Sequence, residues 1–251
     1  MVPHNRRFNR RIARKSTPQL AAVVLLMSAA LANGATSNLK PKAAPLAPAR
    51  LYDFKGVALE TPLEDFRKLT HPDGKIGRVV CTGDTVIENG RSTLFSSLAI
   101  SRDEAALGVT KCTWWGKVYS SLPEDTVSLK TPSDGYIFGE YSFEFIIDPR
   151  DNKSKFYKFF GTSHSNAYTA IFSALSAKFG ASKTTNEAVQ NGFGAHFDSK
   201  VSTWTNTLSI ITVKERWLSV NKLAVMVTDN RLLKIVTDHE VNRKKEIKNE
   251  I

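Results

Sequence analysis

The sequence predicts an α+β fold, in which an antiparallel sheet is packed by one or two amphipathic helices. Strand-like runs rich in aromatic residues recur along the chain, without the regular strand–helix alternation that parallel sheets require. The order is helix, strands, hairpin, helix and strands, followed by a charged C-terminal helix. This order indicates two similar helix-plus-sheet units, at about residues 51–120 and 136–230, within one globular domain that spans 51–251.

The first unit is expected to begin with a short helix. Thr61 can cap this helix, Pro62 suits its first position, and Glu64 completes a Thr-x-x-Glu capping box. Its apolar face would consist of Leu63, Phe66 and Leu69. Strands are predicted at 76–81, 85–88, 92–100 and 112–119, with Asn89-Gly90 as a hairpin turn between the second and the third.

The second unit carries the clearest helical pattern. Apolar residues recur at helical spacing within 165–179, at Tyr168, Ile171, Phe172, Leu175 and Phe179. Gly180 stands where such a helix would end. Strands are predicted at 141–147, 155–160, 195–198, 202–204, 208–213 and 222–228, with a turn at 148–152. Asp229 or Asn230 would cap the terminal helix.

Residues 1–32 have the pattern of a secretory signal peptide. Six basic residues and no acidic residue precede Leu20–Ala32, an almost purely apolar run that ends in Ala30-Leu31-Ala32. We expect cleavage after Ala32, with Gly34 as the next candidate. The alternative is a retained anchor, but 13 helical residues reach only about 20 Å across a hydrocarbon core of about 30 Å. The sequence therefore predicts a periplasmic or secreted protein that meets the membrane only transiently, through this segment.

Cleavage would also change the charge of the chain. The whole chain has a formal net charge of +11, and residues 1–32 carry six of these positive charges, which leaves +5 over 219 residues. Residues 33–50, with Pro41, Pro45 and Pro48 but no apolar periodicity, are predicted to form a disordered linker. Because so little basic excess remains, we expect no nucleic-acid partner.

Cys81 and Cys112 are the only cysteines in the chain. In an oxidising compartment such a pair predicts one disulfide bond, which would close a loop of about 30 residues. Two buried free thiols, or a redox pair, are the alternatives.

The sequence contains no motif that specifies a cofactor, a metal site or a catalytic residue. There is no glycine-rich phosphate loop, no Gly-x-Ser-x-Gly turn and no His-Glu-x-x-His motif. His196 and Asp198 would share one face of a strand, near Ser199 and Ser202, which is compatible with a hydrolase. The alternative is that His196 is a surface residue of a hairpin.

Two further features indicate binding. Trp114 and Trp115 would face opposite sides of one strand, so that one indole could contact a partner protein. The alternative is that both indoles are covered. The basic C-terminal tail, which begins at Arg243-Lys244-Lys245, could bind anionic envelope polymers, although interleaved glutamates favour an ordinary solvated helix face.

Several motifs resemble those of small exported bacterial proteins of unknown function, from Phe54 to the end of the chain. They are Phe54-x-Gly56-x-x-Leu59 continuing to Phe66, Cys112-x-Trp114, Tyr141-x-Phe143, Leu175-x-x-Lys178-Phe179-Gly180 and Trp204-x-Asn206. The resemblance implies an exported α+β domain and supplies no catalytic residue. The element order is also similar to that of beta-lactamase-inhibitory proteins and of small outer-membrane-assembly lipoproteins, which bind proteins.

Taken together, these features predict an exported, non-enzymatic module that binds a protein or associates with the envelope. The binder of anionic polymers and the hydrolase built on His196 and Asp198 are the alternative functions.

Overall fold

The computed structural model describes residues 49–249, except 89–90, 96–97, 118–122, 134, 191 and 193. The chain divides into two units after residue 46, and all described residues belong to the second unit. The predicted signal peptide (1–32) and most of the predicted linker (33–50) lie outside the described residues. No helix among the described residues is both long and apolar enough to cross a membrane.

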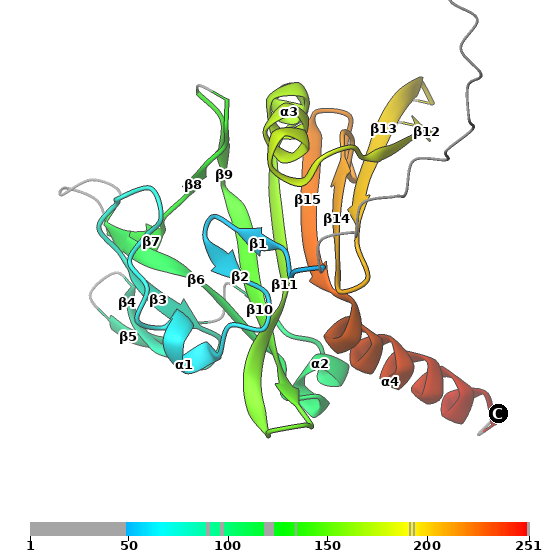
Figure 1. Ribbon diagram of the computed structural model, residues 1–251. Helices are drawn as coiled ribbons and strands as arrows, with labels where there is room; N and C mark the ends of the chain where they lie inside the picture. Colours follow the sequence, from blue (N-terminus) through cyan, green and yellow to red (C-terminus); the bar gives the residue numbers. More distant parts are fainter. Residues whose placement is uncertain are drawn as a thin grey trace, which may run out of the picture. The chain divides into compact units, whose positions relative to one another are not determined.

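Among the described residues the fold is mostly β, with 46% strand against 22% helix, and it is built on one nine-stranded antiparallel sheet. The predicted α+β class, with two similar helix-plus-sheet units, is therefore wrong. Strands from both predicted units pair in the same sheet, as Figure 1 shows. The error has a physical reason, because apolar patterns identify strands but do not specify which strands pair across long separations.

Eight strands follow one another across the sheet and a ninth pairs at one side. In spatial order the eight are β12 (Lys183–Gln190), β13 (His196–Thr205), β14 (Ser209–Lys214), β15 (Lys222–Asp229), β11 (Lys153–His164), β10 (Glu140–Asp148), β6 (Thr110–Lys117) and β3 (Arg78–Cys81). The ninth strand, β7 (Glu124–Thr126), pairs with β6.

Shorter elements surround this sheet. Three two-stranded sheets are formed by β1 (Asp53–Phe54) with β2 (Val57–Ala58), β4 (Thr85–Glu88) with β5 (Arg91–Leu94), and β8 (Leu129–Lys130) with β9 (Ile137–Phe138). The helices are α1 (Leu63–Phe66), α2 (Arg102–Ala106), a 3-10 turn (Ser165–Ala167) that leads into α3 (Tyr168–Phe179), and α4 (Asn230–Asn249).

Several strands differ from the prediction. The strands predicted at 195–198 and 202–204 are one continuous strand, β13, and β5 ends at Leu94 within the predicted range 92–100. In β12 and in the end of β11, strand pairing and not the hydrophobic pattern determines the structure. β12 was not predicted, since most of its side chains are exposed and it lies at the end of the sheet, paired with β13. β11 continues past Phe160 to His164 through its pairing with β15. Gly161 lies inside β11 where a Cβ atom would come within 2.7 Å of the Phe159 ring, which explains a glycine in a strand interior.

The predicted capping box of the first helix does not form. Thr61 donates its hydroxyl proton to the Ala58 carbonyl, at 2.6 Å, and Pro62 is the N-cap, with no side-chain cap hydrogen bond. A capping box forms instead at α2, where the Ser101 hydroxyl accepts from the Glu104 amide and the Glu104 carboxylate accepts from the Ser101 amide.

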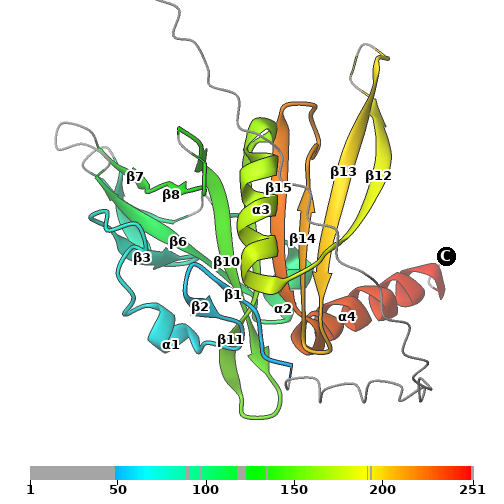
Figure 2. The same ribbon diagram turned by 45° about the horizontal axis from the view of Figure 1, so that its top comes forward.

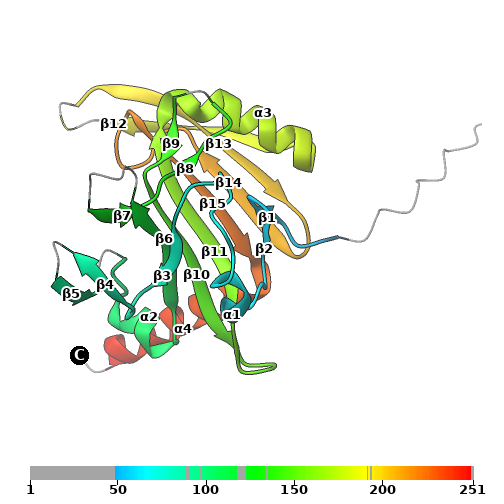
Figure 3. The ribbon, with the colours of Figure 1, turned by 90° about the vertical axis from the view of Figure 1, so that its left-hand side faces the viewer.

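Different elements pack against the two faces of the sheet (Figure 3). On one face, here called the α3 face, the large apolar core lies beneath α3, α1 and the β1–β2 hairpin. On the opposite face, α4 packs Leu232 and Val236 against Ile146 and Tyr157. A third cluster lies between that same face of β3 and β6 and the β4–β5 hairpin.

The core of the α3 face is an aromatic cluster centred on Phe143, which is fully buried. Its ring lies within 5.3 Å of the rings of Phe66, Trp114, Phe156 and Phe159, measured between centroids. Aromatic pairs at such distances contribute about 0.5–1.5 kcal/mol each beyond the burial of their area. The cluster thereby joins α1 and the strands β6, β10 and β11.

A buried carboxylate, Asp148, joins three distant parts of the chain. It accepts hydrogen bonds from Arg150 in the β10–β11 turn, from Lys155 in β11 and from Arg231 in the first turn of α4. Both arginines also pair with Glu60, which lies between β2 and α1. Burial alone raises the pKa of the Asp148 carboxyl, but the cationic donors outweigh it and hold that pKa well below its usual range.

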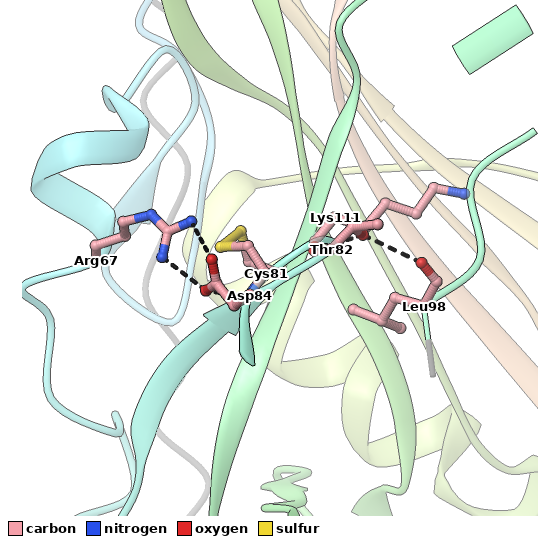
Figure 4. The surroundings of a disulfide bond; sticks show 7 residues. Arg67, Cys81, Thr82, Asp84, Leu98 and Lys111 are labelled. Atoms are coloured by element: carbon pink, nitrogen blue, oxygen red, sulfur yellow. Dashed lines mark hydrogen bonds and ion pairs between the residues drawn. A yellow bond between two sulfur atoms is a disulfide. The ribbon is translucent and has the colours of Figure 1, made fainter. Parts of the chain in front are cut away.

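Cys81 and Cys112 form the predicted disulfide bond. The two residues are fully buried and lie directly opposite each other on β3 and β6. Figure 4 shows how the surrounding chain is fixed: Asp84 accepts from the Cys81 amide and pairs with both terminal nitrogens of Arg67, at the end of α1. The disulfide therefore strengthens the outer strand of the sheet at the point where α1 is attached.

We expect loss of the disulfide to destabilise the protein by about 3–4 kcal/mol, the chain-entropy estimate for a loop of 31 residues. The measurement is urea unfolding of Cys81→Ala/Cys112→Ala beside the oxidised wild type. Reduced wild type is the control and should approach the double variant. A loss below about 1 kcal/mol in both would contradict a stabilising role for this bond.

Candidate functional site

A slot of about 270 Å³ opens on the α3 face between α3, the β1 strand and the β8–β9 hairpin. Figure 2 shows α3 with β8 and β9 on one side and with β12 and β13 on the other. The slot lies on the β8–β9 side. In this slot an apolar floor meets a charged rim, and this combination is typical of ligand sites.

The position of α3 explains why the slot exists. The helix is fastened on its β13 side, where the Tyr168 hydroxyl lies 2.7 Å from the Ser202 hydroxyl. The Trp204 indole donates to the Gly180 carbonyl just past the end of the helix, and Phe172 packs on the Trp204 ring. These contacts hold α3 toward β13 and leave its other flank, with Ala174 and Leu175, unfilled.

The floor and walls of the slot are apolar and held by the core. Phe138, Ile171 and Val225 are at most 3% exposed, although all three line the slot. Phe54 stacks on Phe159, with 3.6 Å between ring centroids, and meets the Phe138 ring edge-on at 5.7 Å. Because these rings are fixed by neighbours beneath them, the slot is preformed and not a gap between mobile side chains.

The rim of the slot carries three lysines and one aspartate, Lys55, Lys130, Lys178 and Asp53. Lys178 pairs with Asp53, and Lys55 pairs with Asp73 at 2.6 Å. The backbone amide of Lys130 donates to Asp73, but among the described residues its ammonium makes no ion pair or hydrogen bond. The rim is therefore net positive, with one ammonium available to an anion.

Behind the rim lies His71, a buried histidine that packs against the edge of Trp114. Its Nδ1 accepts a hydrogen bond from the Asp73 amide, at 3.2 Å. Burial lowers the pKa of the imidazole, and the nearby Asp73 carboxylate offsets this only in part. The pKa of Asp73 is itself lowered, because hydrogen bonds from Lys55 and the Lys130 amide outweigh the effect of burial.

Trp114 and Trp115, the predicted binding residues, face opposite sides of β6 as expected, but both are covered. Trp114 is 0% exposed in the aromatic core, and Trp115 is 3% exposed beneath the β4–β5 hairpin. The Trp115 indole donates to Glu124. The expected exposed indole is therefore absent, because α1 covers one face of β6 and the hairpin covers the other.

His196 and Asp198 are both exposed at the start of β13. The nearby hydroxyls lie elsewhere: Ser199 is buried and accepts from the Arg216 amide, and Ser202 bonds to Tyr168 on the α3 face. The structure thus shows the alternative, in which His196 is a surface residue of a hairpin. Among the described residues no group of three or more histidines, cysteines and carboxylates is placed to hold a metal ion.

The basic tail belongs to α4. Arg243 pairs with Asp103 of α2, whereas Lys244 and Lys245 are exposed. The side chains of residues 246–251 lie outside the described part of the chain.

A second hollow, of about 380 Å³, is lined by Glu140, Thr162, His164 and Lys222 among others. Lys222 pairs with Glu140 at 2.8 Å, so the two charges neutralise each other. The Ser163 hydroxyl on its wall is buried and has no hydrogen-bond partner among the described residues. The lysine and the glutamate of this hollow are paired with each other, whereas the slot beside α3 has a lysine ammonium without a partner among the described residues. We therefore place the candidate site in the slot beside α3.

The residues of the slot were not recognised from the sequence as a site. Its rim comes from β1, β8 and α3, whose residues are more than 100 positions apart at the extremes. One signal was present: Ala174 is a small residue between Ile171 and Leu175 on the apolar stripe of α3, where a larger side chain would fill the space.

Comparisons of the chain with models of protein families, with curated proteins and with solved structures find no match. The site is therefore described by its own geometry.

We expect the stability of the protein to fall as the pH is lowered from about 6.5, the ordinary pKa of histidine. Because the pKa of His71 is lowered in the folded state, the unfolded chain takes up a proton that the folded chain resists. His71→Asn keeps an acceptor for the Asp73 amide but does not titrate. Urea unfolding at about pH 7 and pH 5 should show a smaller loss in the variant; equal losses would contradict this role for His71.

Proposed function

We propose that this chain is an exported, non-enzymatic binding module of the bacterial envelope, and that the slot beside α3 is its binding site. The observation that carries the proposal is a preformed apolar slot whose rim is net positive. Small-molecule sites in proteins are concave and mostly apolar, with a few charged groups that orient the ligand.

The state of the charged groups supports binding over catalysis. A general base needs a carboxylate or imidazole that is free to accept a proton from the substrate. At the slot, Asp53 is paired with Lys178, and Asp73 with Lys55. His71 already accepts a hydrogen bond and is buried behind the rim. These groups hold the rim in place and leave an ammonium, which is suited to binding an anion.

Two observations support export. Residues 1–32 have the basic, apolar and small-residue order of a secretory signal peptide. The Cys81–Cys112 disulfide is of the kind that persists in oxidising compartments and is rare in the cytosol.

We expect the mature protein in a bacterial host to begin at Asn33 and to lie in the periplasmic or culture fraction. Intact-mass measurement of each fraction checks this, and the oxidised chain should be lighter than the reduced chain by two hydrogen atoms. The control is a chain with Leu25→Arg/Leu26→Arg, in which the apolar run is interrupted. Recovery of both chains uncleaved in the cytosol would contradict export.

We expect the protein isolated from the envelope to carry a bound small molecule. Native mass spectrometry should show an adduct on the wild type that is lost in Ala174→Leu, because the larger side chain occupies the slot. Ala177→Leu, at an exposed position of the same helix, is the matched control and should keep the adduct. An adduct of equal abundance in both variants would exclude the slot as the binding site.

A further inference from the structure

We propose that the ligand of this slot is a single unbranched alkyl chain of medium length that ends in a carboxylate, held with its chain along α3 and its head group at the lysine rim. This inference deepens the proposed function and rests on it.

The size of the slot limits the ligand to one short chain. At roughly 30 Å³ for each water-sized group, 270 Å³ holds about nine such groups, and a methylene group is of similar size. The slot is open to solvent on one side, and a lipid with two long acyl chains, or a steroid-sized body, would not be covered by this volume. The slot therefore fits a single chain of about eight to ten carbons.

The shape of the slot follows the helix. Ile171, Ala174 and Lys178 lie three and four residues apart on α3, so they form a stripe along its axis about 10 Å long. The opposite wall is formed by Phe54 and Phe138. Apolar side chains therefore line the slot along the helix, and charged side chains lie at its rim. A chain with one polar end matches this division.

The rim distinguishes an anion from a neutral or cationic head group. Lys178 and the Gly56 amide both contact Oδ1 of Asp53, so the negative charge of this carboxylate is already balanced by a lysine and attracts a further cation only weakly. Lys130 presents an ammonium that is unpaired among the described residues. A carboxylate next to it would form the charge-assisted hydrogen bond that this ammonium lacks.

The rim also favours one negative charge over two. Lys178 is in the last turn of α3, where the carbonyl groups of the helix concentrate partial negative charge. Phosphate sites often use a helix N-terminus or an arginine fork in addition to lysine, and neither a helix N-terminus nor an arginine lies on the lining of this slot. A monoanionic carboxylate is the head group that one free lysine can satisfy.

The experiment is a titration of the purified, delipidated protein with a series of alkyl carboxylates from hexanoate to tetradecanoate, followed by calorimetry. We expect affinity to rise about fourfold for each added methylene and to stop rising near decanoate, when the slot is full. Decanol should bind about tenfold more weakly than decanoate, because it cannot pair with Lys130.

Two variants, each with a matched control, locate the parts of the ligand. Lys130→Gln should reduce the preference for decanoate over decanol by about tenfold, whereas Lys244→Gln, at an exposed position of α4, should not change it. In Ala174→Leu, affinity should stop rising at a chain that is two or three carbons shorter than in the wild type, or binding should be abolished. Ala177→Leu should give the same affinities as the wild type across the carboxylate series.

The outcomes separate the ligand class from the site. Equal affinities for decanol and decanoate, or tighter binding of decyl phosphate, would overturn the carboxylate while the slot remains a binding site. Affinities that do not depend on chain length would overturn the alkyl chain. An adduct on the envelope-derived protein that Ala174→Leu does not remove would overturn the slot itself, and with it the proposed function.

Discussion

One face of the sheet is a large aromatic surface that short elements must cover, and the rest of the structure depends on how this face is covered. Phe143 at its centre is surrounded by rings from α1, β6, β10 and β11. Exposed aromatic area of this size would be unfavourable in water. The available cover consists of α3, the four-residue α1 and the β1–β2 hairpin, and Phe54 of that hairpin stacks directly on Phe159.

This short cover must be held in place by contacts outside the core. The segment that carries β1, β2 and α1 is tied at Glu60 to Arg150 and Arg231, which share the buried carboxylate of Asp148. The end of α1 is tied by Arg67 to Asp84, beside the disulfide. Asp148 is the buried charge of this group, and a buried charge left without its partners costs several kcal/mol, so Asp148 fixes Arg150 and Arg231 in place. The pairs of Glu60 and of Asp84 are partly exposed and add less.

Sequence patterns predicted the elements whose apolar side chains are buried along one face. They failed for elements that are held mainly by backbone pairing with a neighbouring strand. The amphipathic spacing of Tyr168, Ile171 and Leu175 predicted α3, and the paired cysteines predicted the disulfide. β12 has no apolar alternation, because it is an exposed strand at the end of the sheet. The slot was not predictable, since Lys130 of β8 and Lys178 of α3 line the same hollow only in the folded chain, and no local pattern relates them.

The slot persists because neither wall can move to close it. To shift toward β8–β9, α3 would have to break the hydroxyl pair of Tyr168 and Ser202 and the hydrogen bond from Trp204 to Gly180. Moving Phe54 and Phe138 inward would break their contacts with Phe159, on which Phe54 stacks and which Phe138 meets edge-on. Because the interior is close-packed, its side chains cannot shift by small amounts to close the slot. The unfilled apolar space is therefore retained, although it lowers the stability of the folded chain. A ligand that fills the slot restores the missing packing contacts. Because it binds the folded chain and not the unfolded chain, it also stabilises the folded state by mass action.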